Sequence, residues 1–161
     1  MEKSRPSFAF NNHYGVSMHS LNHILDVGTP FLIFEAYVSS YHEFIDFIKF
    51  GWGSALIDPE FESKKEICER FGIKPLLGGT FFEYMIHHHG FADFVKKIEQ
   101  YGLQCVELSR GTIDIDDSLY ASYIKQLSSD YYVMSEVGRK SSDPSQALAP
   151  SQWLAHCELS S

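Results

Sequence analysis

Residues 47–53 read Phe-Ile-Lys-Phe-Gly-Trp-Gly, and this stretch decides the fold that the chain is expected to adopt. An apolar run typical of a buried strand carries Lys49 near its end, and glycines on both sides of a tryptophan then interrupt it. In α/β enzymes with parallel strands, the carboxyl ends of the strands hold the residues that meet the ligand. The stretch therefore predicts a strand that presents a cation to an anionic ligand. The alternative is an ordinary strand whose terminal lysine meets solvent.

The same order, an apolar run followed by a helical pattern, occurs five times along the chain. Each run is almost continuously apolar, which is typical of a parallel sheet covered on both faces. Gly72 and Gly102 stand where helices lead into strands, a position that often requires a positive φ. The pattern predicts an α/β fold in a single domain, preceded by an irregular segment at residues 1–20. The predicted strands span residues 21–27, 45–50, 73–77, 104–108 and 131–137.

The predicted helices have recognisable starts. Pro30 can open a helix because its missing N–H costs nothing in the first turn, and residues 31–44 follow as a largely buried helix. The aromatic residues Phe31, Phe34 and Tyr37 of that helix are expected in the core. Further helices are expected to start near Asp58, Thr80, Ala92, Ser118 and Pro150, with Thr80 as a side-chain cap.

Composition limits the class of protein. A chain of 161 residues that is 44% hydrophobic suits one globular domain with a real core. It is shorter than a complete eight-fold β/α barrel, which usually needs about 200 residues or more. The formal net charge of −8 argues against a nucleic-acid binder, so any anionic ligand must be met by a local cluster of cations.

Cysteine usage and hydropathy indicate the compartment. Cys68, Cys105 and Cys157 are widely spaced and odd in number, which favours reduced, mostly buried thiols in a cytosolic protein. The N-terminus lacks the apolar segment of a signal peptide, and no apolar run approaches about 18 residues. A soluble, cytoplasmic protein without a membrane partner is the expectation.

Ionisable residues follow the predicted strands. Because the carboxyl ends of parallel strands meet at one edge of the sheet, these residues are expected to form a common rim. A single such residue is usually a solvated strand end, but several at the same edge favour an active site. Carboxylate oxygens suit Mg²⁺, a hard cation, better than zinc. The rim residues are Asp26, Lys49, Glu83, Glu107, Glu136, Arg139 and Lys140.

Three other features are weaker. His87, His88 and His89 are consecutive on a predicted helix, so they point about 100° apart and cannot chelate one ion together. Gly78-Gly79-Thr80 before a helix could hold a phosphate on free N–H groups, but a plain strand-to-helix turn needs the same residues. The aspartates of residues 114–117 lack the downstream glutamate of a calcium loop and are interpreted as a loop and helix cap.

Four of these segments together carry a family resemblance. IDFIKFGWGSA (45–55), KPLLGGTFFE (74–83), VELSRGTIDI (106–115) and SEVGRK (135–140) resemble the phosphosulfolactate synthase family, and ILDVG (24–28) matches more loosely. The likeness runs from about residue 15 to about residue 155. It implies a TIM-barrel enzyme that adds sulfite to phosphoenolpyruvate with Mg²⁺ to give (2R)-phospho-3-sulfolactate, a step toward coenzyme M in methanogens. The chain would then form an incomplete barrel of about five β/α units.

The resemblance also implies roles for the rim residues. A lysine and Mg²⁺ would stabilise the enediolate that forms when sulfite attacks the methylene carbon, and a positioned acid would protonate the neighbouring carbon. We expect small-molecule substrates and a homo-oligomer. The expected catalytic residues are Lys49, Arg139 and Lys140; the substrate-binding residues are Lys49, Gly78, Gly79, Thr80 and Arg139; and the metal ligands are Glu107, Glu136 and Asp26.

The sequence also departs from the family pattern. Val27 stands where the family usually has lysine, Arg110 where it has aspartate, and Ser54 where it has threonine. Five β/α units would leave open sheet edges, a liability unless something covers them. The alternative function is therefore a non-catalytic, stress-related or partner-binding protein on the same scaffold. A weaker one is another phosphate-ligand barrel enzyme, such as an aldolase with Lys49 as its Schiff-base lysine.

Overall fold

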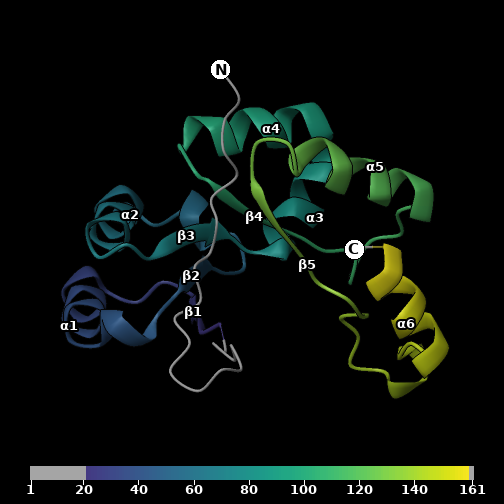
Figure 1. Ribbon diagram of the computed structural model, residues 1–161, viewed down its shortest axis with the longest axis horizontal. Coiled ribbons are helices and arrows are strands. Elements are labelled where there is room, and N and C mark those ends of the chain that lie inside the picture. Colours follow the sequence, from purple (N-terminus) through teal and green to yellow (C-terminus); the bar gives the residue numbers. More distant parts are fainter. Residues whose placement is uncertain (1–20, 160–161) are drawn as a thin grey trace, which may run out of the picture.

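The strands form one parallel sheet. The computed structural model describes residues 21–159, so the segment predicted as irregular, residues 1–20, lies outside the described residues. The strands follow one another in space as they do along the chain, in the order β1-β2-β3-β4-β5 (Figure 1). The α/β prediction is confirmed, and the order is that of a partial TIM barrel. The strands are β1 (His23–Asp26), β2 (Phe47–Phe50), β3 (Lys74–Leu77), β4 (Cys105–Leu108) and β5 (Tyr132–Ser135).

Helices alternate with the strands and lie in an arc around the sheet (Figure 1). Two of them follow β3, and the last stands apart from the others beyond β5. Short 3₁₀ turns at His42–Phe44, Ser54–Leu56 and Pro144–Gln146 complete the connections. The helices are α1 (Phe31–Tyr41), α2 (Phe61–Arg70), α3 (Gly79–His88), α4 (Phe91–Gln100), α5 (Asp117–Leu127) and α6 (Pro150–Leu159).

The two faces of the sheet have different surroundings, because successive side chains on a strand point to opposite faces. On the outer face, Ile48, Phe50 and Leu108 pack among the helices in the main core. Burial of each such side chain contributes roughly 1.5–3 kcal/mol to the stability of the fold. On the inner face, Phe47, Leu76 and Cys105 form a separate small cluster with Tyr132 and Met134. The inner face is the one that would line a barrel.

Two helix predictions need correction. Thr80 does not cap α3: Gly78 occupies the cap position with extended backbone, and Gly79 is already helical. Helix α1 is not largely buried, since only Phe34 and Val38 are enclosed while Leu32 and Tyr37 are exposed. The reason is that α1 covers the β1 edge of the sheet, where none of the described strands lies alongside. By contrast, Asp116 caps α5 as predicted, accepting hydrogen bonds from two backbone N–H groups.

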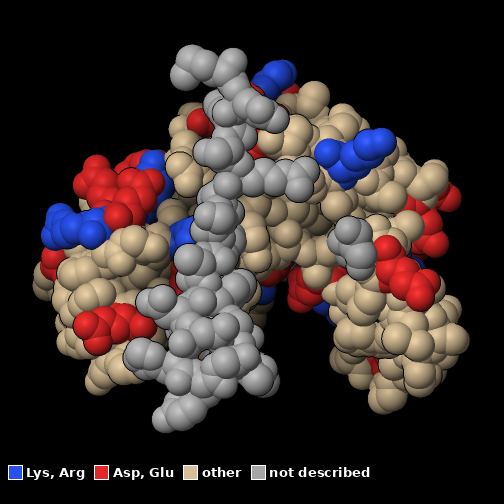
Figure 2. Space-filling view, viewed as in Figure 1, with Lys and Arg blue, Asp and Glu red and all other residues tan. Residues whose placement is uncertain are grey.

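Two of the three cysteines lie in the core of the protein, and charged side chains lie on its surface. Cys68 and Cys105 are buried free thiols, and Cys157 is exposed. Burial raises the pKa of Cys68 to about 12 and that of Cys105 to about 11, so both stay protonated at neutral pH. On the face drawn in Figure 2, basic side chains of the described residues lie in separate small groups and form no continuous patch. Within residues 21–159, no helix is long and apolar enough to cross a membrane.

Candidate active site

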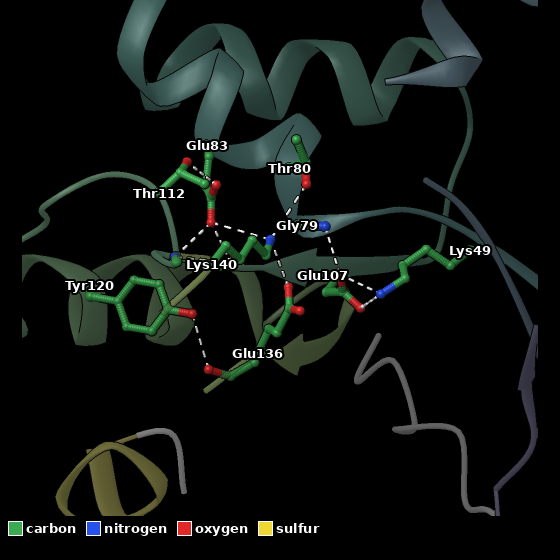
Figure 3. Close-up of polar contacts among 12 residues, drawn as sticks. Lys49, Gly79, Thr80, Glu83, Glu107, Thr112, Tyr120, Glu136 and Lys140 are labelled. Carbon is green, nitrogen blue, oxygen red and sulfur yellow. Dashed lines mark hydrogen bonds and ion pairs between the residues drawn. The ribbon is translucent and has the colours of Figure 1, made fainter. Parts of the chain in front are cut away.

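The predicted strand-end residues of β2 and β4 meet on the inner face (Figure 3). Lys49 Nζ lies 3.1 Å and 3.0 Å from the two carboxylate oxygens of Glu107. Glu107 also accepts a hydrogen bond of 2.6 Å from the Gly79 N–H, and it is buried. The pairing leaves Lys49 beside a carboxylate, which is not the apolar pocket that a Schiff-base lysine requires.

Lys140 reaches the same region from the loop after β5. Its Nζ lies 2.9 Å from a Glu136 oxygen and 3.4 Å from both a Glu83 oxygen and the Thr80 hydroxyl (Figure 3). Its backbone N–H donates to the Gly111 carbonyl at 2.9 Å. The residue is therefore tied at both ends, with its ammonium group between two carboxylates.

Gly79 allows these groups to gather. A Cβ at this position would lie 2.4 Å from the Ser109 Cβ and 3.1 Å from one oxygen each of Glu107 and Glu136. The two carboxylates are therefore neighbours across a point where only glycine fits. The predicted phosphate-binding turn, Gly78-Gly79-Thr80, stands at this point, but the Gly79 N–H already donates to Glu107.

Glu83 lies behind this cluster, on α3, and is buried. It accepts hydrogen bonds from the hydroxyls of Ser109 and Thr112 and, at 2.7 Å, from the Gly111 N–H. Burial opposes its ionisation, but the hydrogen bonds from Ser109 and Thr112 outweigh burial and hold the pKa of Glu83 below its ordinary value. Glu83 is therefore an anion that ties α3 to the loop after β4.

The structure does not bring Asp26 together with Glu107 and Glu136. In the parallel register Leu25 is the neighbour of Lys49, whereas Asp26 is the neighbour of Phe50, so Asp26 faces the helices. There its carboxylate lies 3.1 Å from Lys64 Nζ and also accepts from the Thr29 N–H. A predicted strand shows which residues alternate, but not which set faces inward.

Sequence reasoning missed Lys64. Its Nζ also lies 2.6 Å from Asp58, and the side chain is fully buried. Burial alone would lower its pKa, but the hydrogen bonds to Asp58 and Asp26 raise it, so Lys64 is a buried cation. A signal was available: Lys64 stands three residues after Phe61 and three before Ile67, in the apolar stripe of α2.

The two arginines turn away from the Lys49–Glu107 pair. Arg139 pairs with Asp114 at 2.7 Å, and the Asp114 side chain is largely exposed while that of Arg139 is partly exposed. Arg110, which stands where the family usually has aspartate, pairs with Asp117 and lies over the Tyr120 ring at 4.7 Å. Arg139 still borders a cavity of about 230 Å³ beside the cluster, which opens between the β5 loop and α6. This cavity is lined by Ser109, residues 136–140, Ala147, Leu148 and Trp153.

Among the described residues, only a pair of carboxylates supports the predicted metal site. Within residues 21–159, no three His, Cys, Asp or Glu side chains are arranged as a metal site. His87, His88 and His89 are exposed at the end of α3. Glu107 and Glu136 nonetheless provide neighbouring carboxylates beside Gly79, and one or two carboxylates are what Mg²⁺ commonly takes from a protein.

The fold and this site define a class: an α/β protein of the β/α-barrel type, with lysines and carboxylates gathered where the parallel strands end. Comparison with known proteins specifies it further. The chain belongs to the (2R)-phospho-3-sulfolactate synthase (ComA) family, whose sequence model matches residues 17–160. The family and the fold that the sequence predicted are therefore confirmed.

Two curated relatives are named phosphosulfolactate synthase. The protein of Methanocaldococcus jannaschii is 36% identical over 143 residues, which cover 87% of this chain and 57% of that protein. The protein of Bacillus subtilis is 29% identical over 133 residues, which cover 83% of this chain and 53% of that protein. The chain thus spans about half the length of the curated relatives it matches.

Proposed function

We propose that this chain carries phosphosulfolactate synthase chemistry, the addition of sulfite to phosphoenolpyruvate to give (2R)-phospho-3-sulfolactate. The observation that supports it is the juxtaposition of Lys49–Glu107 and Lys140–Glu136 around Gly79 on the inner face. Family membership supports the same activity. The substrates carry several negative charges, and in a chain of net charge −8 these lysines are a local source of cations at the strand ends.

The reaction needs two events that these residues can assist. The sulfite sulfur forms a bond to the methylene carbon, and the electrons of the double bond move toward the carboxylate as an enediolate. A proton then adds to the carbon that bears the phosphate ester, so no redox partner is needed. Lys49 would stabilise the developing charge, and the Lys140 ammonium would deliver the proton. Arg139, at the cavity beside Lys140, would meet a substrate anion after leaving Asp114.

Mg²⁺ is part of the proposal. Glu107 and Glu136 would hold it, because their carboxylates are neighbours beside Gly79 and carboxylate oxygens are hard donors. When bound, the ion would neutralise charge on the substrate carboxylate. We leave Asp26 out of the ligand set because it faces the helices. We further propose a cytoplasmic location, supported by the buried free thiols of Cys68 and Cys105. A homo-oligomer is also proposed, because a second copy would cover the open edges of the described sheet.

The test is an assay of the purified protein with phosphoenolpyruvate, sulfite and Mg²⁺. We expect sulfite-dependent consumption of phosphoenolpyruvate, reduced at least about 100-fold by Lys49→Ala, as for loss of one preorganised charge-stabilising group. Lys96→Ala is the matched control, since Lys96 forms an exposed pair with Asp93 on α4. A folded protein without turnover would contradict the proposal and favour the non-catalytic alternative.

A further inference from the structure

The hydrogen-bonding capacity of Glu83 is largely taken up by contacts within the protein, with three partners on Oε1 and one on Oε2. A carboxylate can accept about four hydrogen bonds. Glu83 receives three, from Ser109, Gly111 and Thr112, and Lys140 Nζ lies 3.4 Å away as a fourth partner. Its side chain is also only 2% exposed. A substrate or metal ion could not reach it without breaking these contacts, so its place in the site is not that of a ligand.

Two of these contacts bear directly on the side chain of Lys140. A Cβ on Gly111 would lie 2.6 Å from Lys140 Cγ and 2.9 Å from its Cδ, so the stem of Lys140 rests directly on the Gly111 backbone. The Lys140 N–H also donates to the Gly111 carbonyl. Glu83 binds the N–H of the same glycine and contacts the ammonium group. Glu83 therefore restrains both the Gly111 backbone, on which the Lys140 side chain rests, and the Lys140 ammonium group.

The second carboxylate beside Lys140 differs in kind. Glu136 is closer to Nζ, at 2.9 Å, but its side chain is 39% exposed and borders the cavity. It is free to turn toward a ligand or a metal ion, whereas Glu83 is held by hydrogen bonds on both of its oxygens. If Glu136 turns away, Glu83 is the carboxylate that remains next to Lys140.

We propose that Glu83 is a positioning residue, which holds Lys140 and the loop at residues 109–112 in place while Glu136 engages the ligand. The catalytic consequence rests on the proposed function, but the positioning itself does not. This separates the two tests, because the placement of Lys140 can be measured without turnover.

The experiment compares Glu83→Gln, Glu83→Ala and Glu136→Gln with the unaltered protein. Labelling of Lys140 by an amine-reactive reagent, followed by mass spectrometry, reports the exposure of its ammonium group. Hydrogen exchange at the Gly111 N–H reports whether the backbone on which the Lys140 side chain rests is still held in place. We expect labelling to rise about 3-fold or more in both Glu83 variants and exchange to rise about 10-fold in Glu83→Ala, since local opening controls both. Labelling of Lys96 is the internal control and should not change.

In the assay, Glu83→Gln should lower kcat about 10-fold with KM nearly unchanged, whereas Glu136→Gln should raise KM. Unchanged labelling and unchanged exchange in a folded Glu83→Gln protein would overturn the proposal. If Glu83→Ala does not fold, the comparison is made with Glu83→Gln alone. The glutamine amide has the size of the carboxylate and keeps most of its hydrogen bonds. Altered labelling in a protein that has no turnover would support the positioning role and contradict the proposed function.

Discussion

The molecule contains two groups of lysines and carboxylates built from the same residue types, one on each face of the sheet. On the outer face, Lys64 of α2 lies between Asp26 and Asp58 and is fully buried. On the inner face, Lys49 and Lys140 pair with Glu107 and Glu136 beside a cavity. The difference teaches that position on a strand end does not make a charged residue functional. The surroundings on the two faces differ: the outer group is buried in its own ion pairs, whereas Glu136 and Lys140 of the inner group border a cavity.

Replacing Lys64 should have the largest effect on stability. Lys64→Ala leaves Asp26 buried without a cation, which costs about 3–5 kcal/mol of the free energy of unfolding. Lys49→Ala should cost only about 1 kcal/mol, because water reaches the Lys49 end and Glu107 keeps its Gly79 hydrogen bond. Urea denaturation of both variants measures the contrast. Equal losses would show that the two groups do not differ as described, and Asp26→Asn combined with Lys64→Met should recover part of the loss.

Gly79→Ala tests whether the inner group depends on close approach. An added methyl group would meet Ser109, Glu107 and Glu136, and overpacking of this kind costs about 1–3 kcal/mol. Because the carboxylates must move apart, we expect activity to fall more steeply than stability. Gly90→Ala is a matched control for the loss of a glycine next to α3, since no atom lies within 4 Å of its Cβ position, although its φ of 92° adds strain. Unchanged activity in Gly79→Ala would contradict the described geometry.

Acid should weaken both groups. The pKa of Asp58 in the outer group and that of Glu83 behind the inner group both lie below their ordinary values of 3.8 and 4.5. Folded-state pKa values below the unfolded ones add stability above the unfolded pKa, and this stability is lost as pH falls through the folded values. We therefore expect Glu83→Gln to flatten the decline in stability below about pH 4.5, measured by urea denaturation at a series of pH values. If stability falls equally steeply with pH in the Glu83→Gln variant, Glu83 is not ionised in the folded protein as described.

The smallest effect is expected at the exposed pair of Arg139 and Asp114. Asp114→Ala removes a surface ion pair and should change the free energy of unfolding by less than about 1 kcal/mol. If Arg139 is freed to meet a substrate anion, KM in the assay should stay the same or fall. A rise in KM would show that the pair holds Arg139 in its working position.

Much of the site could be predicted because its residues follow apolar runs directly. Lys49, Glu107 and Glu136 were placed at one edge by strand ends alone, and the structure brings them together. Asp26 was grouped with them because its strand ends in the same way, but a shift of one residue along a strand reverses the face. Lys64 was overlooked because a helical lysine normally reaches solvent, and only its two buried partners explain its place.

By itself, the sequence determined the five β/α units and the family. Apolar periodicity, glycines at the ends of helices and strands, and short motifs are local properties of the chain. Only the tertiary structure decided which charged residues share a face and which are buried as partners. The contacts that decide this join residues 28 positions apart, as Gly79 and Glu107, or 58 apart, as Lys49 and Glu107. They depend on strand register and on the close approach at Gly79, which no local pattern in the chain specifies.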